Sequence, residues 1–160
     1  MIKTGLPFLA FLALSTPAIA RDSLGVYSNW AAFRDDSPSR CYAIAKPRGS
    51  NASASFASIA NWPDKGVRGQ LHLRLSRSVD EKGEATLTIG SDTFTLVAKD
   101  RNAWASDARM DAQIVAAMRS ASRMSVAARS ANGSRFSDSY SLSGVATAMD
   151  AATVGCANRG

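Results

Sequence analysis

The sequence predicts a mainly β protein, an antiparallel β-sandwich with two short helices. Short runs rich in apolar, aromatic and β-branched residues recur along the chain, and clusters of Asp, Asn, Ser, Gly and Pro separate them. Two further segments carry apolar residues at helical spacing. With 160 residues, 46% of them hydrophobic and 20% charged, the chain suits one globular domain.

The first 20 residues are predicted to be a Sec signal peptide. Lys3 precedes the apolar stretch Leu6 to Leu14, and the small residues Ala18 and Ala20 form a cleavage site. The stretch is shorter than the ~20 apolar residues of a membrane-spanning helix. We therefore expect cleavage after Ala20 and a periplasmic or secreted domain of residues 21–160, with an uncleaved N-terminal anchor as the alternative.

The predicted export determines the expected redox state of the two cysteines, Cys41 and Cys156. In an oxidising compartment an isolated pair predicts one disulfide bond. Because the bond would close a loop of more than a hundred residues, it would stabilise the fold by roughly 4 to 5 kcal/mol in the chain-entropy model. A redox or metal role is disfavoured, because the chain has no CxxC motif and only one histidine as a further ligand.

Four strands are predicted in the first half of the domain. They are Trp30–Arg34, Cys41–Lys46, Ser55–Ala60 and Gln70–Arg77. The fourth strand alternates cleanly, with Leu71, Leu73 and Leu75 on one face and polar residues on the other. This alternation indicates a buried side and a solvent-facing side.

The second half is predicted to contain two β-hairpins. Ala85–Ile89 and Thr93–Ala98 flank a Gly-Ser-Asp turn, and Met124–Arg129 and Arg135–Tyr140 flank Asn132-Gly133. An Asn-Gly pair between two apolar runs is a strong hairpin signal.

Two helices are predicted near the C-terminal end. Ser106 or Asp107 can cap the first, which has an apolar stripe made of Met110, Ile114, Ala117, Met118 and Ala121. Ser143 can cap the second, which runs from Gly144 to about Thr153, with Gly155 as its stop.

No catalytic residue, cofactor site or metal site is predicted, and we expect the protein not to be an enzyme. The stretch Ser141–Gly144 lacks the first glycine of a GxSxG nucleophile elbow. The alternative is a hydrolase centred on His72, the chain's one imidazole, with a partner carboxylate that the sequence does not rank among Asp100, Asp107 and Asp138. One histidine and an oxidised cysteine pair are too few ligands for zinc.

Binding surfaces are harder to place from the sequence. Five aromatic residues form either a ligand patch or part of the core, and we expect at least Phe33 and Trp104 to be core: Tyr27, Trp30, Phe33, Trp62 and Trp104. The net charge is +6 with interspersed signs and no basic tail, so no nucleic-acid partner is expected. Arg68, Arg74 and Arg77 lie close in sequence, which leaves open a contact with a polysaccharide or, at a membrane periphery, with lipid headgroups.

Several short motifs, taken in order, resemble the invasion associated locus B (IalB) family of exported bacterial proteins. They are Trp30–Phe33, Arg40–Ile44, the helix Asp111–Met118, Met124–Val126 and the closing SLxGxxxA stretch within Tyr140–Ala148. The resemblance implies an immunoglobulin-like β-sandwich, association with the cell envelope and, in some pathogens, a part in host-cell entry. It implies no catalytic residues. Lys99–Ala105 stands in place of a cysteine-containing loop of the family.

These observations favour a non-enzymatic, envelope-associated binding or interaction module. Its expected partner is an envelope protein or a surface polymer, and a contribution to host-cell interaction is a further expectation. The alternative is a periplasmic inhibitor that presents the loop Asn61–Gly69 to a protease or lysozyme.

Overall fold

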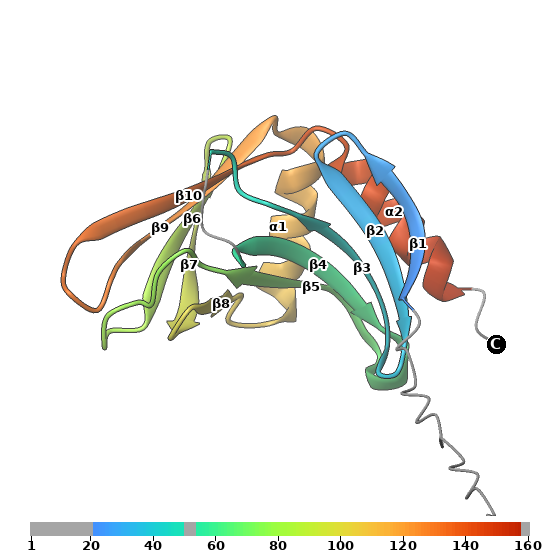
Figure 1. The fold of residues 1–160 in the computed structure, drawn as a ribbon, viewed down its shortest axis with the longest axis horizontal. Helices are drawn as coiled ribbons and strands as arrows, with labels where there is room; N and C mark the ends of the chain where they lie inside the picture. The colour runs from blue at the N-terminus through green and yellow to red at the C-terminus, as the bar shows by residue number, and fades with distance from the viewer. Residues whose placement is uncertain (1–20, 50–53, 158–160) are drawn as a thin grey trace, which may run out of the picture.

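The computed structural model describes residues 21–49 and 54–157, so the predicted signal peptide lies outside the described residues. The described elements follow one another as shown in Figure 1: β1 (Arg21–Tyr27), β2 (Trp30–Asp36), β3 (Ser39–Ala45), β4 (Phe56–Trp62), the 3-10 turn η1 (Pro63–Lys65), β5 (Val67–Arg74), β6 (Glu84–Ile89), β7 (Asp92–Lys99), β8 (Asn102–Trp104), α1 (Ala108–Ser120), β9 (Arg123–Arg129), β10 (Arg135–Ser141) and α2 (Val145–Ala157). The fold is mainly β and antiparallel with two helices, which confirms the predicted class.

The strands form one continuous sheet in the order β1-β2-β3-β4-β5-β8-β7-β6-β9-β10. The short strand β8 joins its two halves, because Ala103 pairs with Leu73 of β5 on one side and with Ala98 of β7 on the other. An immunoglobulin-like sandwich has two separate sheets, whereas here all the described strands belong to one sheet. β8 has only three residues, too few for an alternating pattern, so the sequence did not predict that this strand joins the two halves of the sheet.

The sheet bends so that its last strand lies against the region around β2 and β3. The indole Nε1 of Trp30 donates a hydrogen bond to the Ser141 carbonyl at 2.9 Å, and the Arg48 backbone N donates to the Ser139 carbonyl at 2.7 Å. Both halves of the sheet therefore contribute to one hydrophobic cluster, from Trp30 through the leucines of β5 to Val126 of β9. The layering of a sandwich arises from this bending.

Helix α2 packs on β1, β2 and β3, and the predicted disulfide fastens it there. Cys41 of β3 and Cys156 of α2 are bonded, with their Cα atoms 5.8 Å apart. Ala32 and Ala43 lie on the same face of the sheet as Cys41 and are completely buried. Side chains this small let the helix approach the strands closely.

Two glycines fix how α2 meets the edge strand β1. Gly144, just before the helix, has φ of +87°, and a Cβ there would lie 1.8 Å from the Tyr27 carbonyl oxygen. Gly155 was expected to stop the helix, but α2 continues through it to Ala157. A Cβ on Gly155 would lie 2.5 Å from Leu24 Cδ1, so this glycine serves the close packing of β1 on α2 instead.

Helix α1 covers the middle of the sheet. Of the two predicted caps, Asp107 is the N-cap, and its Oδ1 accepts a hydrogen bond from the Met110 backbone N at 2.8 Å. Ile114 and Met118 are completely buried in the core cluster. Within residues 21–49 and 54–157, neither helix has the length and apolar character that crossing a bilayer requires.

Candidate functional site

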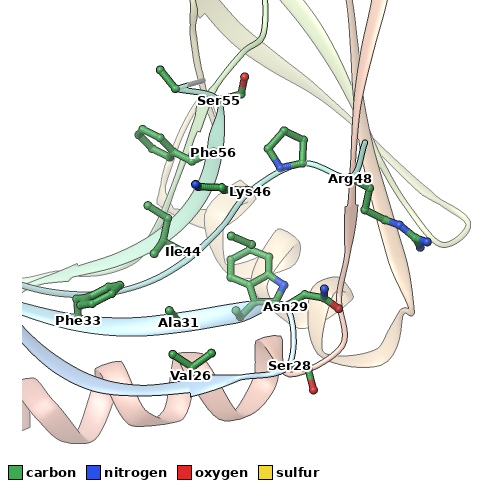
Figure 2. A pocket seen from close by; sticks show the side chains of 14 residues that line it. Val26, Ser28, Asn29, Ala31, Phe33, Ile44, Lys46, Arg48, Ser55 and Phe56 are labelled. Atoms are coloured by element: carbon green, nitrogen blue, oxygen red, sulfur yellow. The ribbon is translucent and has the colours of Figure 1, made fainter. Parts of the chain in front are cut away.

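The strands β1 to β5 have two faces of opposite character. Both described helices pack on the face that carries Ala32, Ala43 and Leu73, here called the covered face. The opposite face, here called the open face, carries mostly large side chains: Val26, Phe33, Tyr42, Ile44, Phe56, Trp62 and His72. In Figure 2, Val26, Ala31, Phe33 and Ile44 project from the strands away from α2.

One end of the open face holds a cavity of about 890 Å³. Val26, Ala31 and Ile44 are register partners on β1, β2 and β3, so they form a continuous apolar row across its floor. Phe33 and Phe56 border the row, and both rings are half-buried. A concave, largely apolar site of this size falls in the range of small-molecule pockets.

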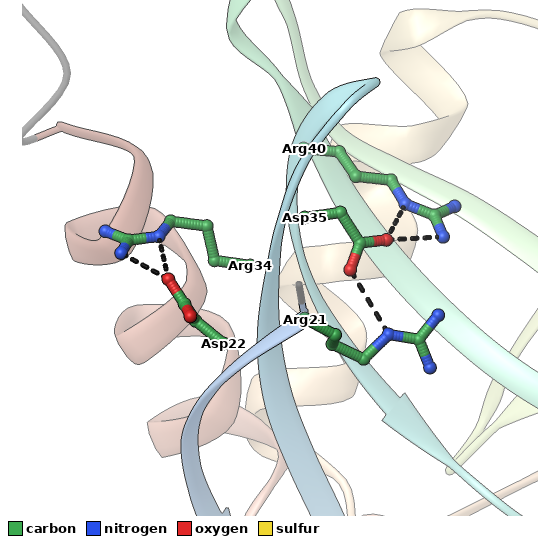
Figure 3. Close-up of polar contacts among 5 residues, drawn as sticks. All are labelled: Arg21, Asp22, Arg34, Asp35 and Arg40. Atoms are coloured by element: carbon green, nitrogen blue, oxygen red, sulfur yellow. Dashed lines mark hydrogen bonds and ion pairs between the residues drawn. The ribbon is translucent and has the colours of Figure 1, made fainter. Parts of the chain in front are cut away.

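The other end of the open face is built around Asp35, whose side chain is only 7% exposed. Its Oδ1 accepts a hydrogen bond from Arg21 Nε at 3.2 Å, and its Oδ2 accepts from Arg40 Nε at 2.8 Å (Figure 3). Arg34 and Asp22 form a separate ion pair on the side of β2 nearer to α2. Asp35 thus holds two guanidinium groups in place on the open face.

Those guanidinium groups lie against a row of aromatic rings. The Arg21 guanidinium carbon is 5.7 Å from the Phe33 ring centre and 5.8 Å from that of Tyr42. The Arg40 carbon is 4.6 Å from the Tyr42 centre and 5.4 Å from the Trp62 centre. These distances are within the range of cation–π attraction. We call this set the cation–aromatic ladder: Arg21, Phe33, Asp35, Arg40, Tyr42 and Trp62.

The pKa of the Tyr42 hydroxyl depends on burial and on the charged groups of the ladder. Burial raises this pKa above its usual value, and the nearby Asp35 carboxylate raises it further. Arg21 and Arg40 act in the opposite direction, because a cation favours the phenolate. Tyr42 therefore stays a neutral hydrogen-bonding group across the physiological pH range.

The loop Asn61–Gly69, which contains the β4–β5 turn, lies at the end of the ladder next to Trp62. Asn61 Oδ1 accepts a hydrogen bond from the Gly69 backbone N at 2.9 Å, and Trp62 Nε1 donates to Gln70 Oε1 at 3.0 Å. Lys65 Nζ lies 4.6 Å from the Trp62 ring centre. The loop considered for an inhibitor is thus held by its own hydrogen bonds and borders the ladder.

The expectation that Phe33 and Trp104 belong to the core is wrong. Trp30 is completely buried in the core and Tyr27 packs against it, whereas Phe33, Trp62 and Trp104 lie outside the core cluster. The reason is the two-residue period of a strand, because Ala32 occupies the covered face and its neighbour Phe33 must point the other way. The sequence signal for the open face was the alternation of Tyr42 and Ile44 with Ala43 and Ala45 in β3, whereas the WAAF run of β2 has no such alternation.

His72 sits among aromatic rings on the open face. Its Nε2 lies 3.0 Å from Asn102 Oδ1, its ring stacks on Trp104 with centres 5.8 Å apart, and the Phe56 ring meets it edge-on at 5.3 Å. The partner of this imidazole nitrogen is therefore an amide.

The three candidate carboxylates lie elsewhere. Asp107 caps α1, Asp138 Oδ2 accepts a hydrogen bond from the Ser76 backbone N, and Asp100 belongs to the turn between β7 and β8. Among the described residues, none of these three carboxylates has a hydrogen bond to His72. Within the part of the chain that the structure describes, no group of three or more His, Cys, Asp or Glu side chains is placed to hold a metal ion.

The three arginines that are close in sequence diverge in the fold. Arg68 lines a small cavity beside Thr153 and Cys156 of α2, and Arg74 pairs with Phe56 and Asn102 on the open face. Arg77 Nη1 donates to Ser134 Oγ in the β9–β10 turn at 3.4 Å. The cations that the fold does gather, Arg21 and Arg40, are 19 positions apart in the sequence.

Comparison with known proteins gave one match. A family model described as invasion associated locus B (IalB) protein matches residues 31–153. The matched segment begins in β2 and ends within α2, so it takes in most of the sheet and of α2, but it leaves out β1, with Arg21 and Val26, and Cys156. No curated protein and no solved structure matches the chain.

Proposed function

The chain belongs to the invasion associated locus B family, and from this premise we propose that it is a non-enzymatic, exported binding module of the cell envelope. Its partner is an envelope protein or a surface polymer that docks on the open face at the cation–aromatic ladder. A contribution to contact with host cells is part of the same proposal.

The cation–aromatic ladder is the observation that carries this proposal. Tyr, Trp and Arg are the residues that contribute most binding energy at protein interfaces. In the ladder Asp35 positions both guanidinium groups, and each of them lies against an aromatic ring. Side chains that are already ordered lose little conformational entropy on binding, so more of the contact energy becomes affinity.

The charge of the ladder indicates the kind of partner. Two arginines surround one carboxylate, and Lys65 adds a further cation beside Trp62. The surface therefore carries surplus positive charge next to flat aromatic rings. A partner with carboxylate or phosphate groups would match it in sign.

The disulfide supports the export part of the proposal. A bond between Cys41 and Cys156 persists in oxidising compartments and is rare in the cytosol. It joins a central strand to the last helix, which suits a domain that must hold together outside the cell interior.

The experiment is site-specific photo-crosslinking in the native envelope. A benzophenone amino acid replaces Lys65, which borders the ladder, and in a matched control it replaces Lys82 on the β5–β6 loop. We expect one defined adduct from position 65 and none from position 82, and we expect the adduct to disappear in Arg40→Ala and Trp62→Ala variants. Equal labelling at both positions, or an adduct that survives both substitutions, would overturn the proposal.

A second candidate is an inhibitor of a protease or lysozyme, and the closed loop Asn61–Gly69 favours it. Its hydrogen bonds and the η1 turn pre-form the loop, as rigid inhibitor loops require. Near-stoichiometric inhibition by the purified protein, lost on Lys65→Ala, would support this candidate. Full activity of every enzyme in a periplasmic protease and lysozyme panel would exclude it.

A further inference from the structure

We propose that the cavity at the far end of the open face is a binding site for an anionic amphiphile, a molecule with one alkyl chain and a phosphate or carboxylate head. This site is distinct from the ladder, and the inference does not rest on the partner proposed for the ladder. Of the residues that the structure describes, Phe33 is the one that lines the cavity and also belongs to the ladder.

The floor of the cavity would take the alkyl chain. The cross-strand row Val26, Ala31 and Ile44 runs at right angles to the strands. The register partner of Ile44 on β4 is Ser58, and Phe56, two residues along β4, lines the cavity diagonally from Ile44. Neighbouring strands lie about 4.8 Å apart, so the three strands of the row give an apolar floor about 10 Å long, and the Phe56 ring adds apolar area beside it. Val26 is 72% exposed, and Ile44 and Phe56 are half-buried, so this row keeps apolar area that folding has left uncovered.

The charges around the cavity indicate the sign of the head group. Among the described residues its lining contains two cationic residues, Lys46 and Arg48, and no acidic residue. Figure 2 shows the ammonium end of Lys46 projecting over the cavity in the direction of Phe56, whereas the Arg48 guanidinium points away from it. Lys46 is therefore positioned to pair with an anionic head at the end of a chain that lies on the floor.

The shape of the site favours one flexible chain over a flat protein surface. The segment Lys46–Arg48 stands above the strands as a wall, and the Arg48 backbone N anchors it to the Ser139 carbonyl of β10. Ser28 and Asn29, both exposed, add polar character at the rim. An apolar floor with few convergent polar groups is the usual composition of a small-ligand site.

The test is isothermal titration calorimetry of the purified protein with dodecyl phosphate below its critical micelle concentration. The comparison ligands are dodecyl maltoside, which has the same chain and an uncharged head, and inorganic phosphate, which has no chain. We expect saturable binding of dodecyl phosphate at one molecule per protein, and binding of each comparison ligand at least tenfold weaker. Absence of saturable dodecyl phosphate binding would overturn the inference.

Variants assign the binding to this cavity. Lys46→Gln should weaken dodecyl phosphate about fivefold, the size of an exposed ion pair, while Lys82→Gln removes the same charge elsewhere and should change nothing. Ile44→Asn places a polar group in the floor and should weaken binding about tenfold. Because Ile44 is half-buried, its substitution can also disturb folding. Val26→Asn, at a 72% exposed position, tests the floor without that risk and should weaken the affinity for dodecyl phosphate about fivefold. Equal affinity of dodecyl maltoside, or equal effects of Lys46→Gln and Lys82→Gln, would show that Lys46 does not select an anionic head.

Discussion

In strands β2 and β3 the neighbours Ala32 and Phe33, and likewise Ala43 and Tyr42, occupy opposite faces of the sheet. On the covered face Ala32 and Ala43 are completely buried beneath α2, and on the open face their neighbours Phe33 and Tyr42 lie under arginines. The usual expectation is that aromatic residues fill the core. Here Ala32 and Ala43 serve the core, because they let a helix approach, while Phe33 is half-buried and Tyr42, only 4% exposed, is covered by arginines instead of a helix.

This difference separates stability from recognition along a single pair of strands. The covered face is fixed by close packing and by a covalent bond to α2. The open face is ordered by Asp35 and by ring contacts, but no described helix lies on it. Substitutions on the covered face should therefore cost folding free energy, and those on the open face should mainly cost binding.

The largest effect is expected from removal of the disulfide that fastens the covered face. The double substitution Cys41→Ala, Cys156→Ala should lower the free energy of unfolding by roughly 4 to 5 kcal/mol, because the bond spans 115 positions and restricts the unfolded chain. Urea unfolding at equilibrium measures this loss, and the reduced wild-type protein should give the same midpoint. A loss below about 1 kcal/mol would show that packing alone holds α2 in place.

A pair of tryptophan substitutions compares the two faces directly. Trp30→Ala removes a completely buried indole and its hydrogen bond to the Ser141 carbonyl, so it should destabilise the protein by about 3 to 5 kcal/mol. Trp62→Ala, on the open face, should cost about 1 kcal/mol or less. Thermal and urea unfolding of both variants measure the contrast. Equal losses would mean that the open-face aromatics support the fold as much as the core does.

The sequence predicted the covered face better than the open one. The alternation of leucines in β5 and the apolar stripe of α1 predicted which residues are buried there. Burial of one face makes apolar residues recur at the period of the strand or helix. The isolated cysteine pair gave the disulfide. The ladder was missed because it joins β1, β2, β3 and the β4–β5 turn, and its cations and rings meet only through strand register.

Two strands were also missed for physical reasons. β1 contains a bulge between Ser23 and Gly25, which interrupts the two-residue alternation that marks a strand. β8 has only three residues and owes its strand geometry to its neighbours. Phe33 and Trp104 were misplaced because a composition argument treats aromatic residues as core, whereas register decides which face each one occupies.

A smaller, pH-dependent effect is expected at Asp111, which joins α1 to the covered face. Burial raises its pKa above the usual value, with a smaller contribution from Asp107, and outweighs the opposite effect of the hydrogen bond that its Oδ1 accepts from the Leu71 backbone N. Since the folded-state pKa is the higher one, the stabilisation is complete below the unfolded-state pKa of about 3.9 and is lost as pH rises through the folded value.

Asp111→Asn keeps the acceptor oxygen and removes the charge. The stability of the variant relative to wild type should therefore increase as pH rises from about 4 through the folded-state pKa, and then level off. Urea midpoints of both proteins at pH 4 and pH 7 measure this change. A relative stability that falls over the same interval would contradict the assigned direction of the shift.

The smallest effect, and the most local one, concerns the phenol groups on the two faces. In the ladder, burial and Asp35 raise the pKa of Tyr42 while Arg21 and Arg40 oppose them, so Arg40→Gln should raise this pKa further. Tyr140 lies completely buried in the core, where burial and then Asp138 raise its pKa, so it should not respond to Arg40→Gln. Absorbance at the phenolate band during alkaline titration measures the Tyr42 pKa, Tyr42→Phe assigns the signal, and Tyr140 should stay protonated in both proteins. An unchanged or lower Tyr42 pKa in Arg40→Gln would mean that the guanidinium does not rest on the ring, and the open face would then lack the ordered cation on which its proposed recognition of an acidic partner depends.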